Sequence, residues 1–152
     1  MIADEMAKQN LTTDNGGPFG AVVVKDGVVV GTGNNHVVRN NDPTAHAEVM
    51  AIRNACTTLD TFDLSGCELY TSCYPCPMCL SADIWANIKT VYYGNTKEDA
   101  AHIGFRDDRI YRCLNDVISR KKNDTVTLIP MDREETIKTF NEYLYKTDKT
   151  MY

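Results

Sequence analysis

Two short segments place the strongest constraint on what this chain can fold into. One holds His46 and Glu48 in the stretch DPTAHAEVMAI, and the other holds Cys76 and Cys79 in the stretch TSCYPCPMCLSADIW. Zinc bound by one histidine and two cysteines keeps its fourth tetrahedral position for water, whereas a structural zinc site is closed by four protein ligands. The two segments therefore predict a fold that brings them together around one zinc ion.

Local signals place both segments at the starts of helices. Asp42 is a good N-cap and the proline after it suits a first helical position, so we expect a helix from residue 43 with His46 in its first turn. A second helix is expected over residues 77–88, with Cys76 as its N-cap. The positive end of a helix lowers the pKa of a cysteine, and the thiolate is the form that binds a metal.

Glu48 lies two residues after the histidine and is expected to carry a proton rather than to bind the metal. Zinc lowers the pKa of bound water to about 7, so hydroxide is available at neutral pH. Glu48 would take the proton from the water, deliver it to a ring nitrogen and later protonate a departing amine. The reaction indicated is hydrolytic deamination of an amidine-like carbon.

These residues also allow other interpretations. A lone histidine on a helix usually packs, and a lone CxxC suits redox chemistry or structural zinc. The spacing of Cys73, Cys76 and Cys79 also resembles part of an iron–sulfur run, but no fourth cysteine follows nearby. A four-ligand zinc site does not need an acid beside its histidine. The joint pattern therefore favours the catalytic zinc site, with Cys73 as a buried thiol outside the ligand set.

Composition excludes several classes of protein. A chain of 152 residues suits a single domain, 1–152. The sequence shows no signal peptide and no apolar stretch of membrane-spanning length, so we expect a cytoplasmic protein with no membrane association. In that reducing compartment, six cysteines favour a metal site or catalysis over a disulfide framework. A net charge of −5 argues against nucleic acid as a partner, because that affinity rests on Lys and Arg neutralising phosphates.

Strands alternate with helices along the chain, which predicts an α/β protein with three α/β/α layers. Five strands are expected in one mixed sheet, at residues 19–24, 28–33, 67–72, 90–94 and 125–130. Asp26 and Gly27 predict a hairpin between the first two. In the helix over 77–88 we expect an inner face of Leu80, Ile84, Trp85 and Ile88. Asp132, with Glu135 three residues later, predicts a capping box for a final helix.

The H-x-E…P-C-x-x-C pattern is the signature of the zinc nucleobase deaminases. With GGPFGAVVVKDG, NNDPTAHAEVMAIRNAC, YTSCYPCPMCL and GFRDDRIY, the chain resembles the bacterial guanine deaminases of the cytidine-deaminase-like superfamily, from about Gly16 onward. The resemblance implies the fold of that superfamily, a homodimer, and conversion of guanine to xanthine with release of ammonia. It also implies one zinc ion per chain with a bound water, held by His46, Cys76 and Cys79, and Glu48 as the proton carrier.

The same resemblance implies that Asn35, Asp107 and Tyr152 contact the base, with Phe19 as a candidate wall. An acidic acceptor such as Asp107 suits guanine, whose pairing edge carries the N1–H and N2–H2 donors, and an asparagine can donate and accept. Two departures stand out. The segment before Gly16 is short for the family's first helix, and Tyr74 stands where many relatives carry Glu.

The C-terminal segment, residues 132–152, is expected to cover the active site of the same or a neighbouring subunit. Cytosine deaminase and tRNA adenosine deaminase share the core motif and remain alternatives within the class. Outside the class stands a non-catalytic, zinc-stabilised interaction module.

Overall fold

The computed structural model describes residues 1–122 and 124–151. The chain divides into two compact units, residues 1–108 and 109–152, and each is described by itself. The expectation of one domain over residues 1–152 stays a prediction. Among the described residues, none of the helices combines the length and the apolar character needed to cross a membrane.

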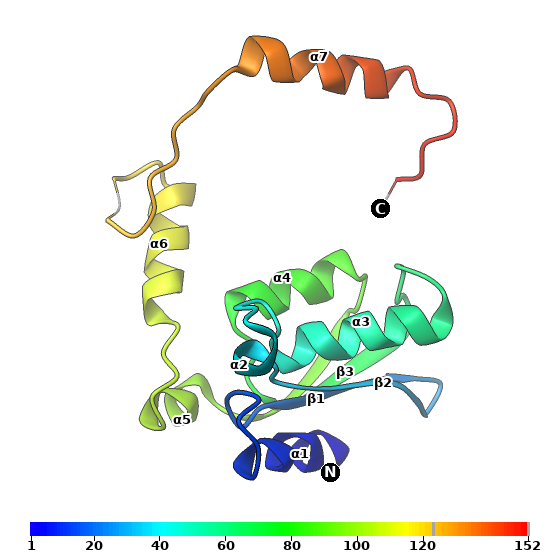
Figure 1. Ribbon diagram of the computed structural model, residues 1–152, viewed down its shortest axis with the longest axis vertical. Coiled ribbons are helices and arrows are strands. Elements are labelled where there is room, and N and C mark those ends of the chain that lie inside the picture. Colours follow the sequence, from blue (N-terminus) through cyan, green and yellow to red (C-terminus); the bar gives the residue numbers. More distant parts are fainter. Residues whose placement is uncertain (123, 152) are drawn as a thin grey trace. The chain divides into compact units, whose positions relative to one another are not determined.

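A mixed sheet forms the centre of the first unit (Figure 1). Its strands are β1 (Gly20–Lys25), β2 (Val28–Asn34), β3 (Cys67–Cys73) and β4 (Thr90–Asn95), in the order β2-β1-β3-β4. β1 is antiparallel to both β2 and β3, and β3 is parallel to β4. The predicted hairpin joins β1 to β2 through Asp26 and Gly27, both at positive φ, which is the conformation that this tight turn requires.

The prediction of a fifth strand over residues 125–130 is wrong for the part of the chain that the structure describes. The sheet has four strands, and residues 125–130 belong to the second unit without strand structure. Alternating apolar side chains suit a pleated surface, but a strand forms only where a neighbour takes up its backbone hydrogen bonds. The sequence pattern showed the first condition and could not show the second.

Helices cover both faces of the sheet, so the three layers are present (Figure 1). On one face lies α1 (Ile2–Lys8), continued by the short 3-10 turn η1 (Gln9–Leu11), and on the other lie α3 (Ala47–Leu59) and α4 (Pro77–Trp85). Strand glycines permit the close approach: a Cβ on Gly20 would lie 2.1 Å from the carbonyl oxygen of Ala3, and one on Gly33 would lie 2.3 Å from that of Ala47. The short N-terminal segment therefore still forms a packed helix.

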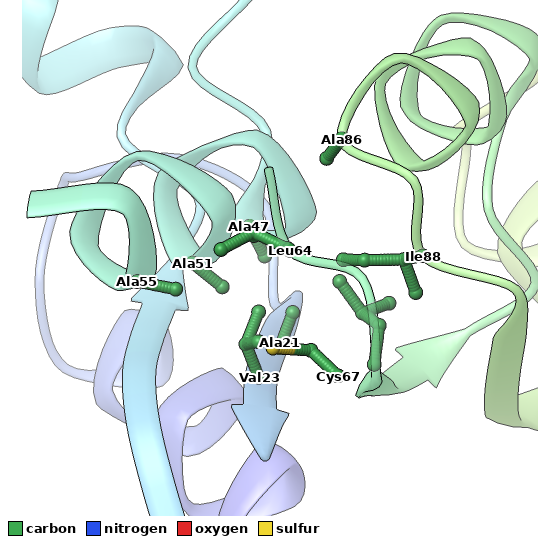
Figure 2. Close-up of a cluster of buried hydrophobic side chains, with 10 residues drawn as sticks. Ala21, Val23, Ala47, Ala51, Ala55, Leu64, Cys67, Ala86 and Ile88 are labelled. Carbon is green, nitrogen blue, oxygen red and sulfur yellow. The ribbon is translucent and has the colours of Figure 1, made fainter. Parts of the chain in front are cut away.

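The core lies between α3 and the sheet (Figure 2). Ala47, Ala51 and Ala55 recur every four residues along α3, and their side chains face Ala21 and Val23 of β1. Small residues at this spacing let the helix pack close to the strands. The start of α3 is therefore fixed against the most buried part of the molecule.

Two helix predictions need correction. α3 begins at Ala47, with His46 as its N-cap, four residues later than expected. The reason is that Asp42 closes a turn of its own, since its Oδ1 accepts hydrogen bonds from the N–H and hydroxyl of Thr44 at 2.8 and 2.6 Å. α4 begins at Pro77 with Cys76 as its N-cap, as predicted, but it ends at Trp85.

The predicted inner face of α4 is also wrong, apart from Ile88, which is buried beyond the helix end. Leu80, Ile84 and Trp85 are exposed, whereas the helix buries Pro77, Cys79 and Asp83. The prediction selected Leu80, Ile84 and Trp85 because they are apolar. In the structure, the helix face that carries Cys79 packs inward, and Asp83 lies one turn further along that face.

The remaining helices are α2 (Val37–Asn40), α5 (Lys97–His102), α6 (Asp108–Ile118) and α7 (Arg133–Leu144). Asp132 is the N-cap of α7, but it lies in the left-handed region and its side chain makes no capping hydrogen bond, so the predicted capping box is absent there.

Candidate metal centre and active site

The starts of α3 and α4 carry the candidate metal ligands. His46 and Cys76 are both N-cap residues with extended backbone, and Cys79 lies in the first turn of α4. The Nδ1 atom of His46 lies 3.6 Å from the Sγ atom of Cys76 and 3.5 Å from that of Cys79. The two sulfurs are 3.6 Å apart. The structure therefore brings together the three side chains that the sequence selected.

These three atoms fit a zinc ion. Zinc–nitrogen and zinc–sulfur bonds of about 2.0–2.3 Å place the corners of a tetrahedron about 3.3–3.8 Å apart. The observed separations of 3.5–3.6 Å fall inside that range. Among the described residues, His46, Cys76 and Cys79 form the group of potential ligands whose donor atoms all lie within 4.8 Å of one another. The donor set is one nitrogen and two sulfurs. Such donors bind zinc in preference to hard cations, which take oxygen ligands.

Hydrogen bonding and charge prepare a thiolate at the start of α4. The hydrogen bond with Cys79, followed by that with His46, lowers the pKa of the Cys76 thiol to about 4. The bond with Cys76, together with burial, raises the pKa of Cys79. The hydrogen bond to the Cys76 sulfur raises the pKa of the His46 imidazole. The shift at Cys76 favours the thiolate, which is the form that binds a metal.

Glu48 lies beside these ligands on the first turn of α3 and is 6% exposed. One carboxylate oxygen, Oε1, accepts a hydrogen bond from the Thr71 hydroxyl at 3.2 Å, and the other, Oε2, accepts one from the Cys79 thiol at 3.4 Å. Burial raises the pKa of the Glu48 carboxyl. Thr71 was not identified from the sequence, although its place in β3, two residues before Cys73, puts it on the strand face that meets the site.

Cys73 lies outside the three-atom group. Its thiol donates a hydrogen bond to the carbonyl oxygen of Thr96 at 3.5 Å, and burial raises its pKa to about 11. Its sulfur is therefore bonded elsewhere, and the grouping of potential ligand atoms contains His46, Cys76 and Cys79 without it.

The candidate base-contacting residues come from three places. Asn35 follows β2 and is 5% exposed, Phe19 precedes β1, and Asp107 lies in the segment before α6. Burial, followed by the charge of the nearby Cys76, raises the pKa of Asp107, so this carboxyl lies near the metal group. Tyr152 lies outside the described residues.

Aromatic packing connects Asp107 with the start of β1. Phe105, two residues before Asp107, meets the ring of Phe19 edge-on, with ring centroids 5.0 Å apart. A Cβ on Gly17 would lie 2.7 Å from the Phe105 ring and 2.8 Å from the Phe19 ring, so only a glycine fits between them. Phe19 therefore packs against the segment that carries Asp107, a contact that the sequence did not indicate.

Asp83 is a further buried acid that sequence reasoning missed. It is 1% exposed, and neither carboxylate oxygen has a hydrogen-bond partner among the described residues. Burial, followed by the charges of Glu48 and Cys76, raises its pKa to about 7. The apolar pattern of α4 gave no signal for it, because that pattern indicated the opposite face of the helix.

The geometry of this site agrees with comparisons to known proteins. Residues 1–95 match the family described as the cytidine and deoxycytidylate deaminase zinc-binding region, and the chain belongs to this family. Guanine deaminase from Bacillus subtilis is 53% identical over 107 residues, which cover 70% of this chain and 69% of that protein. The tRNA-specific adenosine deaminase from Aquifex aeolicus is 45% identical over 76 residues, half of each chain.

Solved structures extend the likeness to the whole chain. The crystal structure of guanine deaminase from Bacillus subtilis superposes with a TM-score of 0.91 at 42% identity, covering 99% of this chain and 94% of that one. A guanine deaminase from Nitrosomonas europaea superposes with a TM-score of 0.66 at 36% identity, covering 70% and 62%. The metal of this family is zinc, and His46, Cys76 and Cys79 are the residues of this chain that fit it.

Proposed function

We propose that this protein catalyses the hydrolytic deamination of guanine to xanthine and ammonia. The observation that carries the proposal is the convergence of His46, Cys76 and Cys79 with Glu48, whose Oε2 lies 3.4 Å from the Cys79 sulfur. The relatives named guanine deaminase, one at 53% identity and one at a TM-score of 0.91 over 99% of the chain, support guanine as the substrate.

His46, Cys76 and Cys79 would hold one zinc ion per chain. When bound at such ligands, zinc supplies a Lewis acid that makes a water molecule nucleophilic at neutral pH. In the reaction, the water oxygen bonds to C2 of guanine, the bond from C2 to the exocyclic amine breaks, and the amine leaves as ammonia.

Glu48 is the proposed proton carrier of this reaction. Its Oε1 accepts a hydrogen bond from the Thr71 hydroxyl at 3.2 Å, and this contact is retained when the Cys79 sulfur binds zinc as a thiolate. A carboxylate fixed in this way accepts a proton from the attacking water, passes it to a ring nitrogen and then protonates the leaving amine. General acid–base catalysis by a positioned carboxylate is worth about 10²–10⁴ in rate.

Asn35 and Asp107 are the proposed contacts to the base, with Phe19 as a wall and Tyr152 as a further contact. Asp107 offers acceptors to the N1–H and N2–H2 donors of guanine. The side-chain Oδ1 of Asn35 is engaged by the Val37 N–H at 3.1 Å, so its Nδ2 group is the donor left for N7 or O6 of the purine. An unmatched polar group in a buried site costs about 1–3 kcal/mol, which discriminates against adenine.

Deamination of adenosine in tRNA is the second candidate, since the Aquifex aeolicus relative with that activity is 45% identical over half the chain. The net charge of −5 favours a free base over a polyanion. Cytosine deamination and a non-catalytic, zinc-stabilised module are weaker alternatives. We further propose a homodimer in the cytoplasm, with residues 132–152 as a cover over the active site of the same or a neighbouring subunit.

Ammonia release from a panel of substrates tests the proposal. The zinc-loaded protein is mixed with guanine, adenine, cytosine, cytidine, guanosine, adenosine or tRNA. We expect guanine to give the highest kcat/KM. Faster release from cytosine, adenosine or tRNA would transfer the assignment to that substrate. If none of them releases ammonia and removal of zinc unfolds the protein, the result would favour the non-catalytic, zinc-stabilised interaction module.

A further inference from the structure

Asn10 occupies a buried position between the N-terminal helix and Asn35, the proposed contact to the base. It lies in η1 and is 8% exposed. Its Nδ2 group donates two hydrogen bonds of 2.8 Å each, to the backbone carbonyls of Gly17 and Asn35. Its Oδ1 accepts a hydrogen bond from Nδ2 of Asn34 at 2.7 Å. Each polar end of this one side chain is therefore used, and one donor contact goes to the backbone of Asn35 itself.

Asn35, the residue that Asn10 holds, has a tightly fixed side chain. Its Oδ1 accepts the N–H of Val37 at 3.1 Å, and a Cβ on Gly16 would lie 2.0 Å from that oxygen. Its backbone N–H donates to the carbonyl oxygen of Phe19 at 3.1 Å. Within the described residues, the structure gives Nδ2 of Asn35 no protein partner. The surroundings of Asn35 thus leave one donor group available to a ligand.

We infer that Asn10 is a positioning residue for substrate recognition: it fixes the backbone of Gly17 and Asn35 and so aims the Asn35 amide at the purine. The inference rests on the proposed function of Asn35 in binding guanine. Removal of the Asn10 side chain frees the two carbonyls, and the turn from Asn35 to Val37 gains freedom. Binding of the base then weakens, whereas His46, Cys76 and Cys79 keep their places, because α3 and α4 hold them.

A purely structural role predicts something different. In that case Asn10 would only attach α1 to the sheet. The helix is already attached without it, since Ala3 and Ala7 are buried and Gly20 admits the α1 backbone at contact distance. Loss of Asn10 should therefore leave α1 in place and disturb the backbone at Gly17 and Asn35.

The experiment compares Asn10→Ala with the matched control Asn54→Ala. Asn54 lies in α3, and its Nδ2 donates to the carbonyl oxygen of Thr32 in β2 at 2.8 Å. The control therefore removes the same kind of hydrogen bond, from an asparagine side chain to a backbone carbonyl, at a place that does not contact Asn35. Three quantities are measured on each zinc-loaded protein: amide hydrogen exchange at Val37 by NMR, zinc content, and kcat and KM for guanine.

For Asn10→Ala we expect Val37 exchange and the guanine KM each to rise about fivefold to tenfold, the size that loss of a buried hydrogen bond gives. We expect kcat to stay within about twofold and zinc to stay at one per chain. Asn54→Ala should match the wild type in Val37 exchange and in KM.

Wild-type values of Val37 exchange and KM in Asn10→Ala would overturn the inference, as would a fall in kcat at constant KM. Asn10→Ser, which keeps a hydroxyl and removes less volume, is made in parallel. If both variants unfold while Asn54→Ala is stable, the role is structural and the inference is wrong. If the wild type releases no ammonia from guanine, the proposed function fails, and Val37 exchange still decides whether Asn10 positions Asn35.

Discussion

The two halves of the candidate site are built in different ways. The metal half consists of His46, Glu48, Cys76 and Cys79, which lie at the starts of two helices packed on the sheet. The proposed substrate half would consist of Phe19, Asn35 and Asp107, which come from strand ends and a connecting segment, together with Tyr152, which lies outside the described residues. The first half is positioned by the core, and the second by a small number of individual contacts.

This difference predicts where the protein tolerates change. The N-cap residues cannot move unless α3 or α4 moves, and the start of α3 is fixed where Ala47 and Ala51 pack on the strands. Asn35, by contrast, is held by three hydrogen bonds to Asn10, Phe19 and Val37. The segment before Asp107 is held by the contact between the Phe105 and Phe19 rings. We therefore expect losses in the metal half to exceed losses in the substrate half.

The largest effect is expected from the ligands. Cys79→Ala should lower zinc well below one per chain and abolish guanine turnover, because a soft ligand is lost from a three-ligand site. Cys73→Ala is the control, since that thiol bonds to the Thr96 carbonyl and lies outside the ligand group. Elemental analysis with an ammonia assay measures both. Equal loss of zinc from the two variants would show that the ligand set is wrong.

Glu48→Gln should come next, with turnover lower by about 10²–10⁴. The amide keeps the size of the side chain but cannot accept a proton from water. Zinc content and the melting temperature should stay close to those of the wild type. Turnover within a few-fold of the wild type would remove Glu48 from the role of proton carrier.

Asp83 should lower the free energy of unfolding of the protein as the pH rises. Its pKa is about 7 in the folded protein and near 3.8 in the unfolded chain, so the folded state holds this proton more tightly. The contribution to stability is full below about pH 4 and is lost as the pH rises to 7, by at most about 4 kcal/mol. Urea unfolding of the wild type and of Asp83→Asn from pH 5 to 8 measures it.

From pH 5 to pH 8, the free energy of unfolding of the wild type should fall relative to that of Asp83→Asn, whose side chain does not titrate. Groups that do not interact with Asp83 titrate equally in both proteins, so the comparison isolates Asp83 together with its coupling to Glu48 and Cys76. A difference that does not depend on pH would mean that the buried carboxyl keeps one protonation state throughout.

In the substrate half, Asp107→Ala should lower kcat/KM for guanine by about 10- to 100-fold, equal to about 1–3 kcal/mol, with zinc unchanged. Asp108→Ala is the matched control, because that carboxylate is exposed and lies 3.9 Å from Arg106. Steady-state kinetics on the two variants decides the matter. If both lose equally, the effect belongs to the local charge and not to a contact with the base.

The smallest effect is expected from a chain that ends at Lys146. Removal of residues 147–152 should raise KM for guanine by about threefold to tenfold and leave zinc in place, because the proposed cover would add contacts to the bound base without touching the metal ligands. Full guanine turnover by the shortened chain would exclude the cover.

The sequence by itself determined the metal half of the site. The spacing of Cys76 and Cys79 around a proline makes one residue an N-cap and the other a residue of the first turn, whatever surrounds them. The hairpin at Asp26 and Gly27 is equally local. These features depend on a few neighbouring residues, so short patterns were sufficient to predict them.

Tertiary structure decided what depends on a partner far along the chain. Residues 125–130 have the pattern of a strand but do not form one in the described part of the chain. α4 turns Asp83 inward although Leu80 and Trp85 are more apolar. Asn10 reaches the carbonyl of Asn35, 25 residues away, through a contact that no local pattern encodes. Propensity states what a segment can form, whereas the available hydrogen-bond partners and the packed face determine what it does form.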